Sequence, residues 1–149
     1  MLNRLSAWWF QKTKHIVQNH LIHSEHDTPI SFVKPCRVFP VEFVVRGFIT
    51  GSTNTSMWTL YNQGVRCFGP IDATISDDEK LRKNQQLPRL FVTPTTKSDI
   101  HDEPITTLFQ LHDLMTVEQF KQCYTAALKL FQFGQDVALS RGLILVDTK

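Results

Sequence analysis

The sequence lacks the features that mark membrane proteins, nucleic-acid-binding proteins and disulfide-rich proteins. No apolar run in its 149 residues approaches the ~20 residues needed to span a bilayer, and the start has no apolar segment typical of a signal peptide. A formal net charge of +2 is too small to predict binding to nucleic acid or to a membrane surface. Cys36, Cys67 and Cys123 are odd in number and form no C-x-x-C pair, which predicts reduced thiols in the cytoplasm.

Composition and element order indicate one globular domain over residues 1–149, of the α+β class. The hydrophobic content is 42% and the charged content 20%, as in soluble proteins. The strands cluster without regular strand–helix alternation, which favours a mixed or antiparallel sheet with flanking helices. The expected elements are a helix over 2–18, a polar loop over 19–29, a short strand within 30–38, a strand over 39–52, a short helix before Gly64, a surface loop over 65–90, a strand from Phe91, a long helix after a capping box at 116–119, and a strand over 142–149.

Three histidines in the first polar segment raise the question of a metal site. His20, His23 and His26 have a spacing that metal ligands could adopt. The segment is polar and ends in a proline, with no residues evident to orient the ligands, which favours a solvated loop. We therefore expect no metal ligands in this sequence.

The stretch Phe39–Ser52 has the alternation of a strand that exposes polar residues on one face. Residues two apart share a face, so Glu42, Arg46 and Ser52 are expected together, opposite a face that can be buried. A guanidinium suits bidentate capture of phosphate or carboxylate, and a glycine–serine turn adds backbone N–H groups and a hydroxyl. The alternative is a buried strand whose arginine makes a structural ion pair.

Two later segments carry further candidate polar residues. Phe91–Pro104 enters a proline turn and brings Lys97, a mobile point charge, and Asp102, an acceptor for hydroxyl or amine groups. Taken on its own, this segment favours a turn with ordinary capping residues. At the other end, Asp147 and Lys149 are two apart on an expected strand, so they should face the same way.

Several of these stretches together resemble SAICAR synthetase (phosphoribosylaminoimidazole-succinocarboxamide synthase). The most specific match is P-V-E-x-V-V-R-x-x-x-T-G-S at residues 40–52. The other matching runs are L-N-x-L-S-x-x-W-F at 2–10, K-N-Q-x-L-P at 83–88, T-P-T-T-K at 93–97 with H-D-E at 101–103, and D-x-K at 147–149. The resemblance spans essentially the whole chain but only the middle of the family's chain.

The resemblance implies a ligase reaction and a role for each matching residue. ATP would phosphorylate the carboxylate of an aminoimidazole ribonucleotide (CAIR), and the amine of L-aspartate would displace phosphate to give SAICAR, a step of purine biosynthesis. The implied roles are substrate binding for Arg46, Ser52 and His101, catalysis for Lys97, Asp102, Asp147 and Lys149, and nucleotide binding for Glu42 and the hinge segment Lys34 to Val38.

Parts of the family's site are expected outside this sequence. The nucleotide lobe would precede residue 1, and the acidic Mg²⁺ ligands would follow Lys149. Two hypotheses therefore stand side by side: an enzyme region of SAICAR synthetase type, or a truncated, non-catalytic protein that binds ribonucleotide or a partner. Apolar edges left by a missing lobe would favour self-association, so a homo-oligomer is possible.

Overall fold

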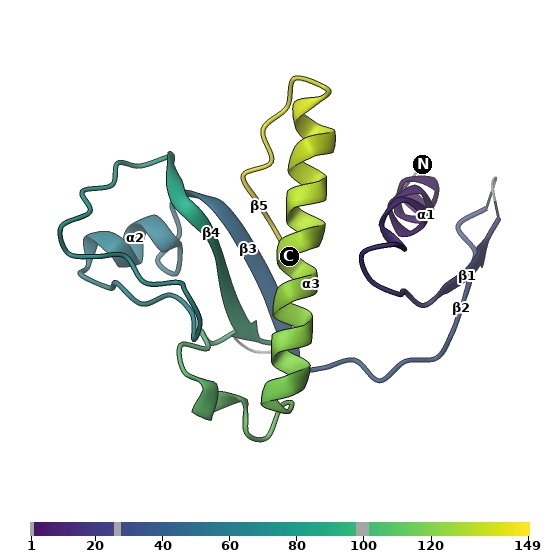
Figure 1. The fold of residues 1–149 in the computed structure, drawn as a ribbon, viewed down its shortest axis with the longest axis horizontal. Coiled ribbons are helices and arrows are strands. Elements are labelled where there is room, and N and C mark those ends of the chain that lie inside the picture. Colours follow the sequence, from purple (N-terminus) through teal and green to yellow (C-terminus); the bar gives the residue numbers. More distant parts are fainter. Residues whose placement is uncertain (1, 26–27, 98–101) are drawn as a thin grey trace. The chain divides into compact units, whose positions relative to one another are not determined.

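The computed structural model describes residues 2–25, 28–97 and 102–149. His26 and His101, both named from the sequence, lie outside these ranges. The chain forms two compact units, Met1–Val38 and Phe39–Lys149, hereafter unit 1 and unit 2 (Figure 1). Among the described residues, no helix is long and apolar enough to cross a membrane. A single domain over residues 1–149 stays a prediction.

Unit 1 is a helix against a two-stranded antiparallel hairpin. It consists of α1 (Leu2–Thr13), β1 (Leu21–Ser24) and β2 (Ser31–Val33). The amide of Asn3 joins the helix to the hairpin, because its Nδ2 donates to Ser24 Oγ and to the carbonyl of Thr28, each at 3.0 Å. Polar contacts therefore help to hold the helix against the hairpin.

The structure corrects three predictions in this region. The helix expected over 2–18 ends at Thr13, whose hydroxyl donates to the carbonyl of Trp9 at 2.7 Å. A threonine hydroxyl that bonds the preceding turn competes with the backbone ladder, which favours an end there. The expected polar loop over 19–29 contains β1, and the strand expected within 30–38 is limited to 31–33.

Unit 2 is built on a three-stranded sheet in the order β4–β3–β5. The strands are β3 (Val41–Ile49), β4 (Gln85–Thr96) and β5 (Asp147–Thr148), and both pairings are antiparallel. This confirms the α+β class with an antiparallel sheet. The final strand was expected over 142–149 but is limited to β5, because Leu143 and Ile144 are exposed and have no core to join.

Helix α3 (Val117–Leu139) covers one face of the sheet (Figure 1). Its N-cap is Thr116, which exchanges hydrogen bonds with Gln119 and so confirms the predicted capping box. Phe131 of α3 packs on Val45 and Val92 in one buried cluster. A second cluster joins Val41, Phe120 and residues around the short 3₁₀ helix η1 (Leu108–Leu111). Glu42 and Arg46 alternate with the residues that meet α3, so they lie on the opposite face.

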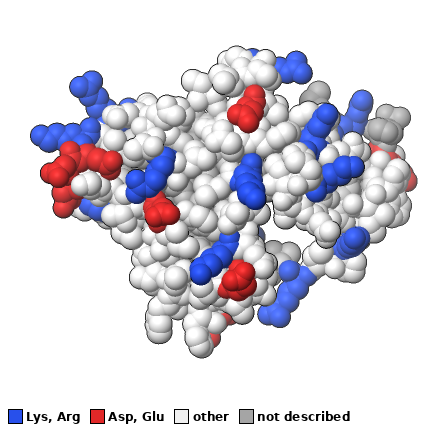
Figure 2. Space-filling model, viewed as in Figure 1, with Lys and Arg blue, Asp and Glu red and all other residues white. Residues whose placement is uncertain are grey.

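The segment 65–90 is more ordered than the predicted surface loop. Four of its apolar residues are buried, packed with α2 (Met57–Asn62) in a third cluster, and β4 starts at Gln85. Those residues are Phe68, Ala73, Ile75 and Leu87. Charged residues of the segment stay outside, as the Arg66–Asp77 pair at 3.1 Å illustrates, and Figure 2 shows acidic and basic side chains mixed at this end of unit 2. The prediction was wrong because isolated apolar residues among charges gave no periodic signal.

A close approach between the end of β3 and α2 requires glycine at position 51. A Cβ on Gly51 would lie 2.3 Å from Ser56 Cβ, and the residue has φ +110°. Gly64 also has a positive φ, but a Cβ there would meet nothing within 4 Å. Ser56 is the N-cap of α2, so this contact fixes where the helix begins.

The two glycines offer a matched pair of substitutions. Gly64→Ala should cost about 1–2 kcal/mol, the backbone penalty for a side chain at positive φ. Gly51→Ala should cost more than Gly64→Ala, because Ser56 must move as well. Urea denaturation of both variants checks this order. Equal losses in the free energy of unfolding would mean that Ser56 moves away from the new Cβ at no cost in stability.

Candidate functional site

Five charged side chains gather on the face of the sheet opposite α3, and we call them the charged cluster. They come from three strands that are distant in sequence: β3, the end of β4 and the end of β5. Antiparallel pairing places Arg46 directly opposite Asp147. Residues two or four apart on one strand then share that face. The cluster consists of Glu42, Arg46, Lys97, Asp147 and Lys149.

Glu42 lies between two ammonium groups. Its Oε1 is 2.7 Å from Lys97 Nζ, a hydrogen-bonded ion pair, and its Oε2 is 3.3 Å from Lys149 Nζ. Hydrogen bonding from Lys97, then from Lys149, holds the pKa of the Glu42 carboxyl below its usual range. The carboxylate is therefore charged throughout the neutral range and bridges β4 to β5 across β3.

The guanidinium of Arg46 bonds to side chains of β4 and β5, the two strands that flank β3. Its Nε donates to Thr93 Oγ1 at 3.0 Å and its Nη1 to Asp147 Oδ2 at 3.3 Å. The hydroxyl of Thr93 donates in turn to the carbonyl of Val44 at 3.3 Å. Burial lowers the pKa of Arg46, and the charge of Asp147 opposes that change. A guanidinium has five N–H donors, so these two bonds leave donors for a further anion.

Acidification tests the Glu42 contacts. Because the folded-state pKa lies below the unfolded value of about 4.3, this group stabilises the fold above that value, and the contribution is lost as pH falls through the folded pKa. A carbon-13 titration of the Glu42 carboxyl should give a pKa below 4.3 in the wild-type chain. Lys97→Met and Lys149→Met should each raise it. An unchanged pKa in both variants would contradict the ion pairs.

The other site residues predicted for unit 2 are Ser52, His101 and Asp102. Ser52 is exposed, and the helix after it is capped by Ser56, so Ser52 is not at a helix start. Asp102 is partly buried in the segment that leads to Pro104, which pairs with Thr95. His101 lies outside the described residues.

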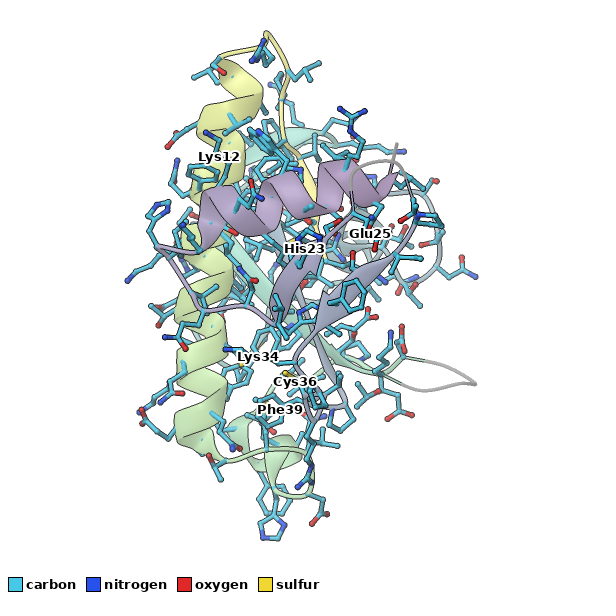
Figure 3. The ribbon with its side chains drawn as sticks, turned by 90° about the vertical axis from the view of Figure 1, so that its right-hand side faces the viewer. Lys12, His23, Glu25, Lys34, Cys36 and Phe39 are labelled. Atoms are coloured by element: carbon cyan, nitrogen blue, oxygen red, sulfur yellow. The ribbon has the colours of Figure 1, made fainter. Side chains whose placement is uncertain are left out.

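The predicted hinge leaves β2 as extended chain. Residues 34–39 belong to no helix or strand, Lys34 is exposed and Val38 is 79% exposed. Lys34 also lines an open cavity of about 660 Å³ within unit 1, together with residues of α1 and β1. Figure 3 labels Lys34 on the ribbon that leaves β2, with His23 and Glu25 among the other residues that line the cavity.

Two threonines belong to this face and were not assigned from the sequence. Thr93 is 8% exposed and fixes the Arg46 guanidinium. Thr95 pairs directly with Glu42 across the β3–β4 ladder, and its buried Oγ1 has no hydrogen-bond partner within the described part of the chain. The signal that could have found them is their spacing, because 93, 95 and 97 alternate on one strand and therefore share the face of Lys97.

The described residues contain no group of three or more His, Cys, Asp or Glu side chains that could hold a metal ion. In the charged cluster, the carboxylates of Glu42 and Asp147 already face cations. These residues do not fit a Mg²⁺ ion, and we assign none of them to one.

Known proteins with similar sequences share one family. The family model described as SAICAR synthetase matches residues 1–149. A phosphoribosylaminoimidazole-succinocarboxamide synthase of Legionella pneumophila is 48% identical over 154 residues, which cover 100% of this chain and 46% of that protein. A chloroplastic protein of the same name from Arabidopsis thaliana is 49% identical over 150 residues, covering 100% of this chain and 35% of that protein. The chain thus spans about half the length of the curated relatives it matches, or less.

Solved structures agree with the sequence relatives. The SAICAR synthase of Saccharomyces cerevisiae, solved with SAICAR, aligns with a TM-score of 0.74 at 25% identity, over 99% of this chain and 52% of that one. The SAICAR synthetase of Pyrococcus horikoshii aligns with a TM-score of 0.73 at 22% identity, over 97% of this chain and 55% of that one, which shows the same fold. With a family model that matches every residue from 1 to 149, this chain belongs to the SAICAR synthetase family.

Proposed function

We propose that this chain takes part in the ATP-dependent ligation of L-aspartate to the carboxylate of CAIR, which yields SAICAR in purine biosynthesis. The carboxylate would attack the γ-phosphorus of ATP and release ADP. The aspartate amine would then attack the acyl phosphate, form the amide and release inorganic phosphate. Such chemistry depends mainly on positioning and on neutralising anionic charge.

The observation that carries the proposal is the charged cluster. The sequence proposes residues 42, 46, 97, 147 and 149 for the site, and their side chains form ion pairs on one face of the sheet. Arg46 would bind the ribonucleotide phosphate with its remaining donors, helped by Ser52 and His101. Lys97 and Lys149 would face the reacting carboxylate, and Asp102 and Asp147 would accept hydrogen bonds from the substrate.

ATP would be bound in part by the hinge. Residues 34–39 lie in no helix or strand, but the N–H of Lys34 donates to the carbonyl of His20 at 2.8 Å, so contact with an adenine edge would come from backbone groups after Lys34. One neighbour supports a nucleotide in this fold, a SAICAR synthetase solved in complex with ADP. The family's Mg²⁺ would neutralise phosphate charge, and its ligands would come from outside the described residues of this chain.

Compartment and assembly are part of the proposal. Cys36 and Cys67 are free and exposed, which suits a reducing compartment such as the cytoplasm. Exposed apolar residues such as Ile22 and Phe32 on the hairpin of unit 1 would suit contact with another polypeptide, including a second copy. Small molecules rather than nucleic acids or membranes would be the ligands.

Calorimetric titration of the purified chain with CAIR, and separately with Mg-ATP, tests the proposal. Saturable CAIR binding by a chain shown to be folded by circular dichroism is the expected result. A parallel incubation with CAIR, L-aspartate and Mg-ATP, followed by chromatography for SAICAR, reads out the ligation. A folded chain that binds neither ligand would overturn the proposal.

The same experiment separates the second candidate. CAIR binding without SAICAR formation would identify a non-catalytic ribonucleotide-binding protein. This chain spans only about half the length of these relatives, and residues that correspond to their other half would have to complete the catalytic site, so we keep this candidate. SAICAR formation by the chain alone would exclude it.

A further inference from the structure

Glu42 has a contact pattern that the ligation scheme does not use. It is the acid between the two lysines of the charged cluster, with its Oε1 on Lys97 and its Oε2 near Lys149. The Glu42 side chain is 20% exposed, whereas the two lysine side chains are 61% and 66% exposed. The acid is thus the fixed member of the trio, and the lysines are the mobile ones.

The lysines need a fixed partner to stay together. A lysine has a long, flexible side chain whose ammonium group is not held by the backbone, and two such groups repel each other. Lys97 follows β4 and Lys149 follows β5, on opposite sides of β3. A carboxylate on the middle strand offers one oxygen to each and offsets the repulsion.

We infer that Glu42 is a positioning residue, which holds the ammonium groups of Lys97 and Lys149 so that both bind one anionic group of the substrate. This inference rests on the proposed function, and it names the role of Glu42 within that site. The trio carries a net charge of +1, because two ammonium groups outweigh one carboxylate. An arriving carboxylate or phosphate would meet two oriented donors without ordering them itself.

Orienting the donors in advance has a direct effect on affinity. Binding costs about 0.5–1.5 kcal/mol for each flexible side chain that it immobilises. Glu42 removes part of that cost for both lysines before the ligand arrives. Its own negative charge opposes an anion nearby, so the two effects have opposite signs and an experiment can separate them.

The Glu42→Gln substitution separates the orientation of the lysines from the repulsion of the anion, because the two effects change CAIR affinity in opposite directions. If Glu42 only repelled the ligand, removing its charge would strengthen binding. Because it orients two lysines, we expect binding to weaken by about 10-fold. Glu118→Gln removes the same charge from the first turn of α3, away from the charged cluster, and should leave affinity unchanged. Tighter or equal binding by Glu42→Gln would overturn the inference.

Rescue and a ligand-free measurement complete the test. Glu42→Asp keeps the charge on a shorter side chain and should recover part of the lost affinity. A short difluorodinitrobenzene cross-linker should join Lys97 to Lys149 in the wild-type chain and in Glu118→Gln, but not in Glu42→Gln, as read by peptide mass spectrometry. If the folded wild-type chain binds neither CAIR nor Mg-ATP, the proposed function fails, and the cross-link alone decides the positioning role. A cross-link that persists in Glu42→Gln would overturn it.

Discussion

Replacing Phe131 with alanine should lower the free energy of unfolding by about 3–5 kcal/mol, the cost of deleting a buried aromatic side chain. Phe131 is 1% exposed and packs on Val45 and Val92, where α3 crosses the sheet. Truncation would leave a cavity between the helix and both long strands. Urea denaturation monitored by circular dichroism measures the loss, with the midpoint expected to fall at constant slope.

Phe109→Ala is the matched control for this substitution. It removes the same side chain from the surface of η1, where Phe109 is 86% exposed. We expect a change within about 0.5 kcal/mol, as for most surface substitutions. A loss as large as that of Phe131→Ala would mean that Phe109 is covered in solution. A small loss for Phe131→Ala would contradict the packing of α3 on the sheet.

Local patterns predicted the central strand and the long helix. The alternation of residues 41–46 placed Phe43 and Val45 on the face that meets α3 and Glu42 and Arg46 on the other, and Val44 departs by being buried on the polar side. The register shift between Arg46 and Phe48 ends this alternation, so Ile49 packs with Phe91 rather than with Val45. The capping box at Thr116 marked the start of α3 because its hydrogen bonds join residues three apart. Such signals are contained within a few residues, so a sequence displays them.

Local sequence patterns did not predict the contacts between segments that are distant in the chain. The buried residues of 65–90 are isolated apolar positions whose partners lie on α2 and β4, and no local period marks them. The pairing of β3 with the two-residue β5 depends on register, which sequence does not state. The Glu42 contact with Lys97 and Lys149 follows from that register. Sequence named the charged residues, and strand pairing decided which acid meets which base.

Arg46→Ala should weaken CAIR binding by about 100-fold, the usual scale for truncating a partly buried charge that pairs with its ligand. Arg46 is 21% exposed, and its guanidinium is held in place by Thr93 and Asp147. Arg46→Lys should recover little, because an ammonium group lacks the planar fork that can bond Thr93, Asp147 and an anion at once. Arg141→Ala, on the exposed turn after α3, should leave binding unchanged.

Asp147→Asn distinguishes anion binding from a purely structural ion pair at Arg46. If Arg46 only ties β5 to β3, both Arg46→Ala and Asp147→Asn remove that tie, and both should lower stability without a specific loss of CAIR affinity. If Arg46 binds the ligand phosphate, Asp147→Asn leaves the guanidinium in place and frees a donor, while Arg46→Ala removes it. Titrations with CAIR under conditions where all variants are folded should therefore show a loss of about 100-fold for Arg46→Ala and a much smaller one for Asp147→Asn, whose amide oxygen can still accept a hydrogen bond from the substrate. No specific loss of affinity in Arg46→Ala would assign Arg46 to the fold.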